Sequence, residues 1–423
     1  MSERNSWPMN VLVEARVAGS VDLLRLREAI DGAVARHPAA GYRVAPSPTF
    51  GRVLRWERPE RFDVDPVVVA TGVEATLSHP IDLAASPAFR VIVVPTPGGE
   101  TRLALCAHHA VFDGEGTVNF LREVVAAYIG TEPTWPPANS SRRAADHSGN
   151  RVTPGRLATI RQVLWPPRAT RLAPASHLAP VVQHSARGGF GVTFARAGST
   201  TVPVAGVGPS VSTVNDLLLA ALHLAVAERN ESLGRTVELV SVTVPVSGRS
   251  SPEQRCSISN HTGQTTVWSA AGDRADPDVL LANIRAQMAD AKRGGAADIT
   301  TESMGVTRWL PVRVRRHLPL LVSALTADRG LATSRLSNLG RIPSDGLTDP
   351  ALDVRSLWFA PPCRPPQTLV IGACGYLGGL NLTARWCRPA WDERSAEEFL
   401  HGVRRQVARL GDGLFDEVDD DDV

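Results

Sequence analysis

Hydrophobic and polar positions recur with two different periods along the first part of the chain. Alternation predicts a strand over 11–19, and apolar residues three and four positions apart predict a helix over 20–38 that Pro38 ends. The same pattern predicts further short strands at 41–45, 51–56, 67–70, 89–95 and 101–109. A second helix is expected directly after Asp113. The N-terminal part therefore mixes strands with helices.

The second half repeats this mixture after a stretch of weak periodicity. Residues 131–190 are rich in Pro, Ser and Arg, which predicts a long crossover linker. Helices are predicted after it at 211–230, 278–293, 301–328 and 395–410, and strands at 237–246, 334–343, 357–359 and 377–386. Because the elements mix without strict βα alternation, we expect an α/β (α+β) fold of two subdomains with mixed sheets.

Length and composition fit two globular domains and exclude several classes of protein. The chain has 423 residues, of which 43% are hydrophobic and 21% charged, a globular rather than a disordered composition. A formal net charge of +2 offers no broad attraction to nucleic acid or anionic membranes. No apolar run reaches about 18 residues, and the N-terminus lacks the pattern of a signal peptide. We expect a cytoplasmic protein with no membrane span and no nucleic-acid partner.

The cysteines indicate neither a disulfide scaffold nor a metal site. They are odd in number and show no C-x-x-C spacing; the five are Cys106, Cys256, Cys363, Cys374 and Cys387. Cys106 lies within an apolar strand, where inert buried cysteines occur, so no catalytic role is expected for it.

The segment CAHHAVFDGEG, residues 106–116, places two histidines, an aspartate and a glycine directly after an apolar strand. A histidine at a strand end can act as a general base, since its ordinary pKa is close to neutral pH. Asp113 can bond that histidine directly, as in a triad, or pair with an arginine and shape the loop. The competing interpretation is a structural histidine. A metal site is disfavoured, because adjacent residues of a strand point to opposite faces.

Other catalytic signatures are absent from the sequence. It contains no G-x-S-x-G elbow, no phosphate loop ending in Gly-Lys-Ser/Thr, no H-E-x-x-H and no G-x-G-x-x-G. This argues against a serine hydrolase, a P-loop NTPase, a zincin and a Rossmann dehydrogenase.

The pattern H-H-x-x-x-D-G at 108–114 resembles the signature of the condensation-domain and chloramphenicol acetyltransferase-like superfamily. Further segments resemble that family in the same order over most of the chain: 35–38, 79–91, 212–226, 244–249, 337–340 and 375–382. The Ser-Asn-Leu-Gly of 337–340 is similar to an element of standalone polyketide-associated acyltransferases. The D-F-G-W-G element of plant acyltransferases is missing, which also favours the standalone type.

The resemblance implies two chloramphenicol acetyltransferase-like subdomains in a V with a tunnel between them. Residues 1–135 would form the N-terminal subdomain with the histidine motif, and 136–190 the linker. Residues 191–423 would form the C-terminal subdomain, with a latch-like crossover near 360–380.

The resemblance also implies roles for single residues. His109 would be the catalytic base and His108 a supporting residue, while Asp113 would form a structural salt bridge and Gly114 would keep the acceptor channel open. Arg43 is the arginine we expect to pair with Asp113. The remaining candidates are Arg249, expected to pair within its own subdomain, and three tunnel-lining residues, Ser337, Asn338 and Trp358.

The implied reaction transfers an acyl group from a thioester to an alcohol or amine. The donor would be an acyl or peptidyl carrier protein or coenzyme A, with the phosphopantetheine arm as part of the substrate and no bound cofactor or metal. A basic patch for an acidic carrier protein is expected from arginines of the linker: Arg142, Arg143, Arg151 and Arg156. The alternatives are a catalytically silent docking protein, or dehydration, cyclisation or epimerisation on the same scaffold. We expect a monomer.

Overall fold

The computed structural model of the chain describes residues 8–45, 55–59, 64–73, 79–131, 172, 190–200, 213–293, 332–364, 367–388, 390–411 and 415–416. The helix predicted over 301–328 lies outside the described residues, as does nearly all of the linker 136–190 with its four arginines.

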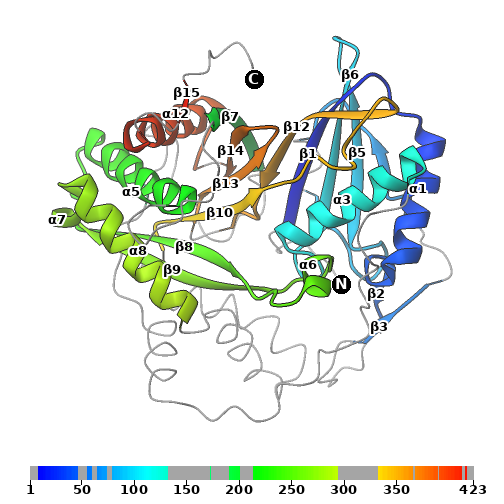
Figure 1. Cartoon of the computed structure of the whole chain (residues 1–423), viewed down its shortest axis with the longest axis horizontal. Coiled ribbons are helices and arrows are strands. Elements are labelled where there is room, and N and C mark those ends of the chain that lie inside the picture. Colours follow the sequence, from blue (N-terminus) through cyan, green and yellow to red (C-terminus); the bar gives the residue numbers. More distant parts are fainter. Residues whose placement is uncertain are drawn as a thin grey trace.

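The N-terminal sheet has six strands in the order β11-β12-β1-β6-β5-β4. These are β11 (Thr348–Asp349), β12 (Leu352–Ala360), β1 (Asn10–Ala18), β6 (Glu100–His108), β5 (Phe89–Pro95) and β4 (Val67–Val69). Helices α1 (Leu23–Arg36) and α3 (Gly114–Ile129) lie together beside this sheet and share its core (Figure 1). A 3₁₀ turn (Pro38–Gly41) and a two-stranded sheet of β2 (Arg43–Val44) and β3 (Trp56–Glu57) follow α1.

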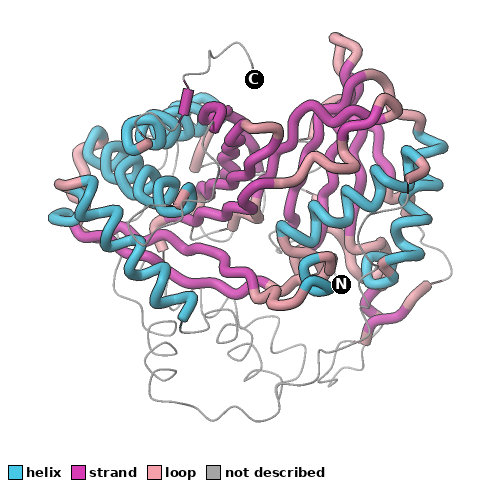
Figure 2. Tube along the Cα trace, in the orientation of Figure 1, coloured by secondary structure: helices cyan, strands magenta, loops and turns pink. Residues whose placement is uncertain are grey.

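The C-terminal sheet has seven strands in the order β15-β7-β14-β13-β10-β8-β9. They are β15 (Phe415–Asp416), β7 (Phe190–Thr200), β14 (Gly379–Cys387), β13 (Leu369–Tyr376), β10 (Ser334–Arg341), β8 (Leu239–Ser247) and β9 (Thr262–Ala270). The helices that share its core are α5 (Val214–Ser232), α8 (Pro277–Arg293) and α12 (Glu393–Leu410). The short helices α6 (Pro252–Arg255) and α7 (Ala271–Arg274) flank β9. Figure 2 shows strands of both sheets in the middle and most helices at the two sides.

Local sequence explains where the helices begin and end. Asp22 caps α1 by accepting bonds from the N–H groups of Leu24 and Arg25, and Thr213 forms a capping box with Asp216 at the start of α5. The predicted helix over 20–38 is therefore present, shortened at both ends by its cap and by Pro38.

Polar side chains of β14 join the two sheets. The Asn381 amide donates to the carbonyl of Leu357 at 2.7 Å, and the Thr383 hydroxyl donates to the carbonyl of Phe359. Arg385 donates to the carbonyl of Asn10. All three side chains are buried, and buried donors are stable when they find such acceptors. The mixed-sheet α/β fold expected from the sequence is confirmed.

The chain passes between the two sheets on both sides of β11 and β12. β11 and β12 follow β7–β10 in sequence, yet they complete the N-terminal sheet, where β12 pairs with β1. β12 ends at Ala360 in the N-terminal sheet, and β13 begins at Leu369 in the C-terminal sheet, where it pairs with β10 and β14. The chain therefore also passes between the sheets in this interval, and the latch-like crossover expected near 360–380 stays a prediction. The predicted subdomain boundaries stay predictions. No helix of the described ranges is long and apolar enough to cross a membrane.

Candidate active site

Strand β6 ends at His108, and the chain turns tightly there before α3 begins. The N–H groups of Val111 and Phe112 both donate to the carbonyl of His108, at 3.0 and 3.1 Å. The N–H of His109 donates to the carbonyl of Met9 at 2.7 Å. The residues 108–113, which we call the motif loop, are therefore tied to themselves and to the segment before β1.

The imidazole of His109 has a defined orientation. Its Nδ1 lies 2.9 Å from the carbonyl oxygen of Phe112. A carbonyl oxygen only accepts, so Nδ1 carries the hydrogen and Nε2 keeps its lone pair. Nε2 has no hydrogen-bond partner within the described ranges, which leaves it available to accept a proton.

The surroundings of His109 keep it neutral. Burial lowers its pKa, the bond to the Phe112 carbonyl opposes this, and the positive charge of Arg335 lowers it further. The net direction is downward, so the imidazole is unprotonated at neutral pH and can act as a base.

The imidazole of His108 bonds the backbone of the motif loop, unlike the imidazole of His109, whose Nε2 is available to accept a proton. Its Nδ1 accepts the N–H of Ala110 at 3.1 Å. Burial, together with the neighbouring His109, lowers the pKa of His108 to about 4. A neutral His108 with an occupied Nδ1 agrees with the supporting role implied by the resemblance.

Asp113 caps α3 and pairs with an arginine. Both Nη atoms of Arg249 reach its carboxylate, at 2.6 and 2.8 Å. Its other donors are the N–H groups of Gly116 and His261 and the hydroxyl of Thr262. Burial alone would raise the pKa of Asp113, but the bonds and charge of Arg249 lower it. Five donors occupy both oxygens, which favours the loop-shaping role over the triad.

The expectation that Arg43 pairs with Asp113 is wrong. Arg43 lies in β2, where its Nε bonds Glu57 of the paired strand β3 at 2.7 Å. Arg249 was expected to pair within its own subdomain, but its ion pairs are with Asp113 and Glu115 of the N-terminal half. Within its own half it bonds the backbone carbonyls of Gln254 and Ser259.

The segment between β8 and β9 holds the motif loop from the C-terminal half. Its residue Asn260 donates through its side-chain amide to the carbonyl of His109, and through its N–H to the carbonyl of Val111, both at 2.8 Å. Phe112 and Ser259 form an isolated β-bridge beside it. Sequence reasoning missed Asn260, because no pattern links a loop residue to a motif 151 positions away.

Comparison with known proteins identifies relatives that match most of the chain. No family model matches the chain. The chain is 30% identical over 389 residues to "Uncharacterized protein Rv2305" and, equally, to "Uncharacterized protein MT2362" of two Mycobacterium tuberculosis strains, H37Rv and CDC 1551. The match covers 89% of this chain and 89% of each relative. The chain belongs to the Rv2305 family.

Solved structures show that this member of the Rv2305 family has the condensation-domain and chloramphenicol acetyltransferase-like fold. TRI3 trichothecene 15-O-acetyltransferase from Fusarium sporotrichioides matches 96% of the chain and 91% of its own, with a TM-score of 0.66 and 11% identity. The starter condensation domain of rhizomide synthetase RzmA matches 98% and 92%, with a TM-score of 0.65 and 13% identity. The epimerization domain of tyrocidine synthetase B matches 96% and 91%, with a TM-score of 0.57 and 16% identity.

Gly114 is closely packed by neighbouring side chains, and the open acceptor channel expected of it stays a prediction. A Cβ at this position would lie 2.5 Å from Cδ2 of Leu339 and 3.0 Å from the ring of Phe359. Side chains of β10 and β12 therefore pack over the first residue of α3. Gly116 leaves even less room for a side chain, because a Cβ there would collide with the backbone carbonyl of Ile258.

The three tunnel-lining candidates lie on the strands that approach the motif. Ser337 is buried on β10, and Asn338 beside it accepts the N–H of Gly340 at 2.9 Å, which satisfies the turn at the strand end. Trp358 is buried on β12, where it meets Phe194 edge-on at 5.3 Å between ring centroids. Trp358 therefore packs against a strand of the C-terminal sheet. The tunnel itself stays a prediction.

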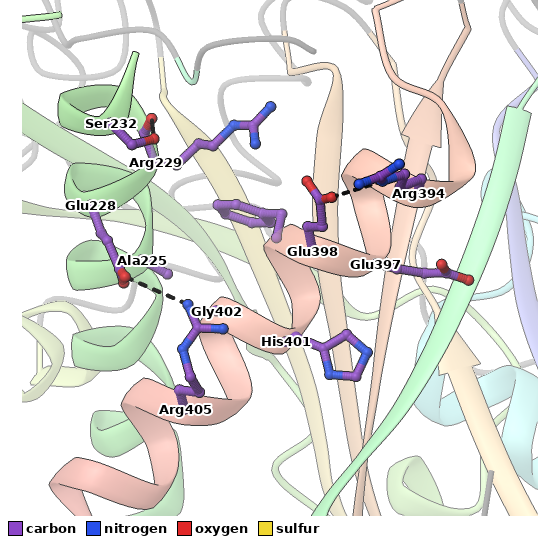
Figure 3. Close-up of a pocket in the computed structure, with 11 residues that line it drawn as sticks. Ala225, Glu228, Arg229, Ser232, Arg394, Glu397, Glu398, His401, Gly402 and Arg405 are labelled. Atoms are coloured by element: carbon purple, nitrogen blue, oxygen red, sulfur yellow. Dashed lines mark hydrogen bonds and ion pairs between the residues drawn. The ribbon is translucent and has the colours of Figure 1, made fainter. Parts of the chain in front are cut away.

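A groove of about 620 Å³ lies elsewhere on the molecule, between α5 and α12 (Figure 3). Two ion pairs lie in its lining: Arg394 with Glu398 at 3.0 Å, and Arg405 with Glu228 at 3.5 Å. None of its lining residues belongs to the motif loop, so this groove is not the candidate active site. The described part of the chain contains no cluster of three or more His, Cys, Asp or Glu that could hold a metal ion.

Proposed function

We propose that this protein is an acyltransferase that moves an acyl group from a thioester to an alcohol or amine acceptor. The observation that carries the proposal is the state of His109. Its Nδ1 hydrogen is committed to the Phe112 carbonyl, and its Nε2 lone pair is free among the described residues. The fold supports the same reaction class, since its structural neighbours include an acetyltransferase and a condensation domain.

The proposed reaction needs one base and no covalent enzyme intermediate. Nε2 of His109 removes the proton of the acceptor hydroxyl or amine as its oxygen or nitrogen bonds to the thioester carbonyl carbon. The carbon–sulfur bond then breaks, and the imidazolium returns the proton to the thiolate that leaves. No nucleophilic serine or cysteine takes part. The protein binds no cofactor in this scheme, since the phosphopantetheine arm belongs to the donor.

The donor is proposed to be coenzyme A or an acyl or peptidyl carrier protein. The RzmA neighbour was crystallised in complex with C8-CoA and Leu-SNAC, which supports a coenzyme A-type donor here. The Ser-Asn-Leu-Gly of 337–340 places ester formation ahead of amide formation, by its similarity to standalone polyketide-associated acyltransferases. We propose a cytoplasmic monomer that acts in natural-product or lipid biosynthesis.

A second candidate function is epimerisation by the same histidine. The observation that favours it is the shared fold of the tyrocidine synthetase B epimerization domain. In that reaction Nε2 would remove a proton from carbon rather than from a hydroxyl or amine, and the product mass would not change.

Product mass separates these functions. Purified protein is incubated with acyl thioesters of pantetheine, coenzyme A and a carrier protein, together with pooled alcohols and amines, and the products are weighed by mass spectrometry. Acyl mass added to an acceptor is the expected result. No change of mass in ordinary water, together with uptake of deuterium at the acyl α-carbon when the reaction is run in D₂O, would support epimerisation. Binding of the carrier protein without either product would contradict an enzymatic function and favour a catalytically silent docking protein.

A further inference from the structure

Two arginines act on His109 and have no carboxylate partner in the part of the chain that the structure describes. Arg335 lies on β10, and Arg364 lies in the segment between β12 and β13. The positive charges of both lower the pKa of His109, so both lie within electrostatic range of the imidazole. Both charges therefore act at the candidate active site.

The position of Arg335 on β10 directs it toward the motif loop. Alternate residues of a strand lie on the same face, so Arg335 shares a face with Ser337 and Leu339. Leu339 is the residue whose side chain packs over Gly114 of the motif. Leu336, on the other face, lies in the core beneath the C-terminal helices. Arg335 therefore occupies the face that β10 turns toward the histidine motif.

Arg335 carries an unpaired charge in a partly buried place. Its Nε is buried and has no hydrogen-bond partner within the described ranges. Burial, together with the nearby Arg364, lowers the pKa of Arg335 to about 10; the thiol of Cys363 opposes this, and no carboxylate of the described residues does. An unpaired buried charge is costly, and proteins ordinarily pair it. A ligand that brings a negative charge would remove that cost.

Arg364 is placed to complete the same site from the opposite segment. It follows Cys363, whose Sγ lies 3.3 Å from Sγ of Cys387 on β14, so the segment is anchored to the C-terminal sheet. The Arg364 side chain is exposed to solvent, yet burial by the surrounding protein still lowers its pKa. Arg364 is therefore an arginine that solutes can reach, and its charge acts on His109.

We propose that Arg335 and Arg364 bind a carboxylate carried by one of the two substrates, close to the group that reacts at His109. The proposal rests on the proposed acyl transfer and narrows its substrate class to anionic donors or acceptors. Arginine is suited to this ligand, because its planar N–H donors match the two oxygens of a carboxylate. The phosphate of the pantetheine arm fits less well, since it lies at the opposite end of the arm from the thioester that must reach His109.

Matched substrates test the proposal and identify which substrate carries the charge. In the donor arm, adipoyl-pantetheine is compared with adipamoyl-pantetheine, in which an amide replaces the carboxylate. In the acceptor arm, 3-hydroxybutyrate is compared with 3-hydroxybutyramide. In one of the two arms the wild type is expected to prefer the carboxylate substrate over the amide. Arg335→Gln and Arg364→Gln are each expected to lower kcat/KM for that carboxylate substrate about tenfold or more. Arg335→Lys, which keeps the charge, is expected to retain part of it.

The control variant is Arg341→Gln, which changes an exposed arginine of the same strand. It should leave the preference unchanged. Equal losses for carboxylate and amide substrates in Arg335→Gln would overturn the proposal, as would a wild type that transfers acyl groups with no carboxylate preference.

A binding measurement separates this inference from the proposed function. Non-reactive thioether analogues of adipoyl- and adipamoyl-pantetheine, with the two acceptors, are titrated calorimetrically into wild type and Arg335→Gln. A carboxylate preference that Arg335→Gln abolishes would support the site even if no transfer is found. No preference in either substrate arm would overturn the site, whatever the transfer assay shows.

Discussion

Arg249 donates to the carboxylate of Asp113 through both of its terminal nitrogens, at 2.6 and 2.8 Å, although 136 positions separate the two residues. Each side chain is only 1% exposed. The ion pair fixes the segment between β8 and β9 to the start of α3, and so to the motif loop that carries His109. The active-site geometry therefore depends on both halves of the chain.

Breaking this ion pair should destabilise the protein strongly. Arg249→Met leaves the buried carboxylate of Asp113 without its cation, and we expect the free energy of unfolding to fall by about 3–5 kcal/mol. The control is Arg355→Met, which breaks exposed pairs with Glu100 and Asp353 and should cost less than about 1 kcal/mol. Urea unfolding at neutral pH measures both. A loss for Arg249→Met no larger than that of the control would contradict the importance of the pair.

The contribution of Asp113 should depend on pH in a defined direction. Its folded-state pKa lies below the ordinary value of 3.8, because Arg249 outweighs burial. The stabilisation is therefore complete above the unfolded pKa, near pH 4, and is lost as the pH falls through the folded pKa. Asp113→Asn should cost most stability at neutral pH, and the difference from wild type should shrink below about pH 4. A difference that stays constant from neutral to acid pH would contradict this.

Asn260 should act as a positioning residue for His109. Asn260→Ala removes the bond to the His109 carbonyl, and we expect kcat to fall about tenfold while KM changes little. Asn119→Ala is the matched control, because Asn119 of α3 bonds the same segment at Arg255 and Ser257 without touching the motif loop. Steady-state kinetics of both variants, compared with their urea unfolding, measure the effect. Equal losses of kcat in the two variants would reduce Asn260 to a structural role.

Two helical glycines should respond to alanine in opposite directions. At Gly116 a Cβ collides with the carbonyl of Ile258, a backbone atom that has little room to move, so Gly116→Ala should destabilise the protein by about 1–3 kcal/mol. At Gly32, within α1, the nearest atom is 3.8 Å away, and alanine should stabilise by about 0.5–1 kcal/mol. Thermal unfolding of the two variants checks the signs. A stabilising Gly116→Ala would show that α3 does not approach Ile258 this closely.

Much of this architecture was predictable from local pattern. The helix after Asp22 and the strand that ends at His108 have strong periodicity and clear boundaries, and the structure contains both. Five strands of the described residues were missed: β7, β9 and β13, and the two-residue strands β11 and β15. The sequence of β9, TGQTTVWSA, is mostly polar on one face, and β13, LVIGACGY, contains two glycines, so neither shows the alternation that identifies a strand.

The candidate site was predictable only where its residues are close in sequence. His108, His109 and Asp113 lie within one short segment, and their spacing identified the motif. The partners of that motif come from distant segments: Arg249 and Asn260 from the segment between β8 and β9, and the two arginines near His109 from β10 and the segment after β12. Only the folded sheets bring these groups together, which is why Arg43 was chosen wrongly as the partner of Asp113.

The pH dependence of transfer should report the environment of His109. The pKa of His109 is lowered from 6.5, so the base stays unprotonated below that pH. As the pH is lowered, kcat/KM should therefore stay constant until the pH is below 6.5, and only then fall. Arg335→Gln removes a positive charge that lowers this pKa, and it should move the acidic limb to higher pH for an uncharged substrate pair. An acidic limb that lies above pH 6.5 in the wild type would contradict a base in this environment.

The most direct measurement compares acyl transfer by His109→Ala and His108→Asn at neutral pH, with near-ultraviolet circular dichroism to show that each variant is folded. The account predicts that His109→Ala loses about 10²–10⁴-fold in kcat, the contribution typical of a general base. His108→Asn, which keeps an acceptor for the N–H of Ala110, should lose no more than about tenfold. A folded His109→Ala variant with wild-type kcat would contradict the account.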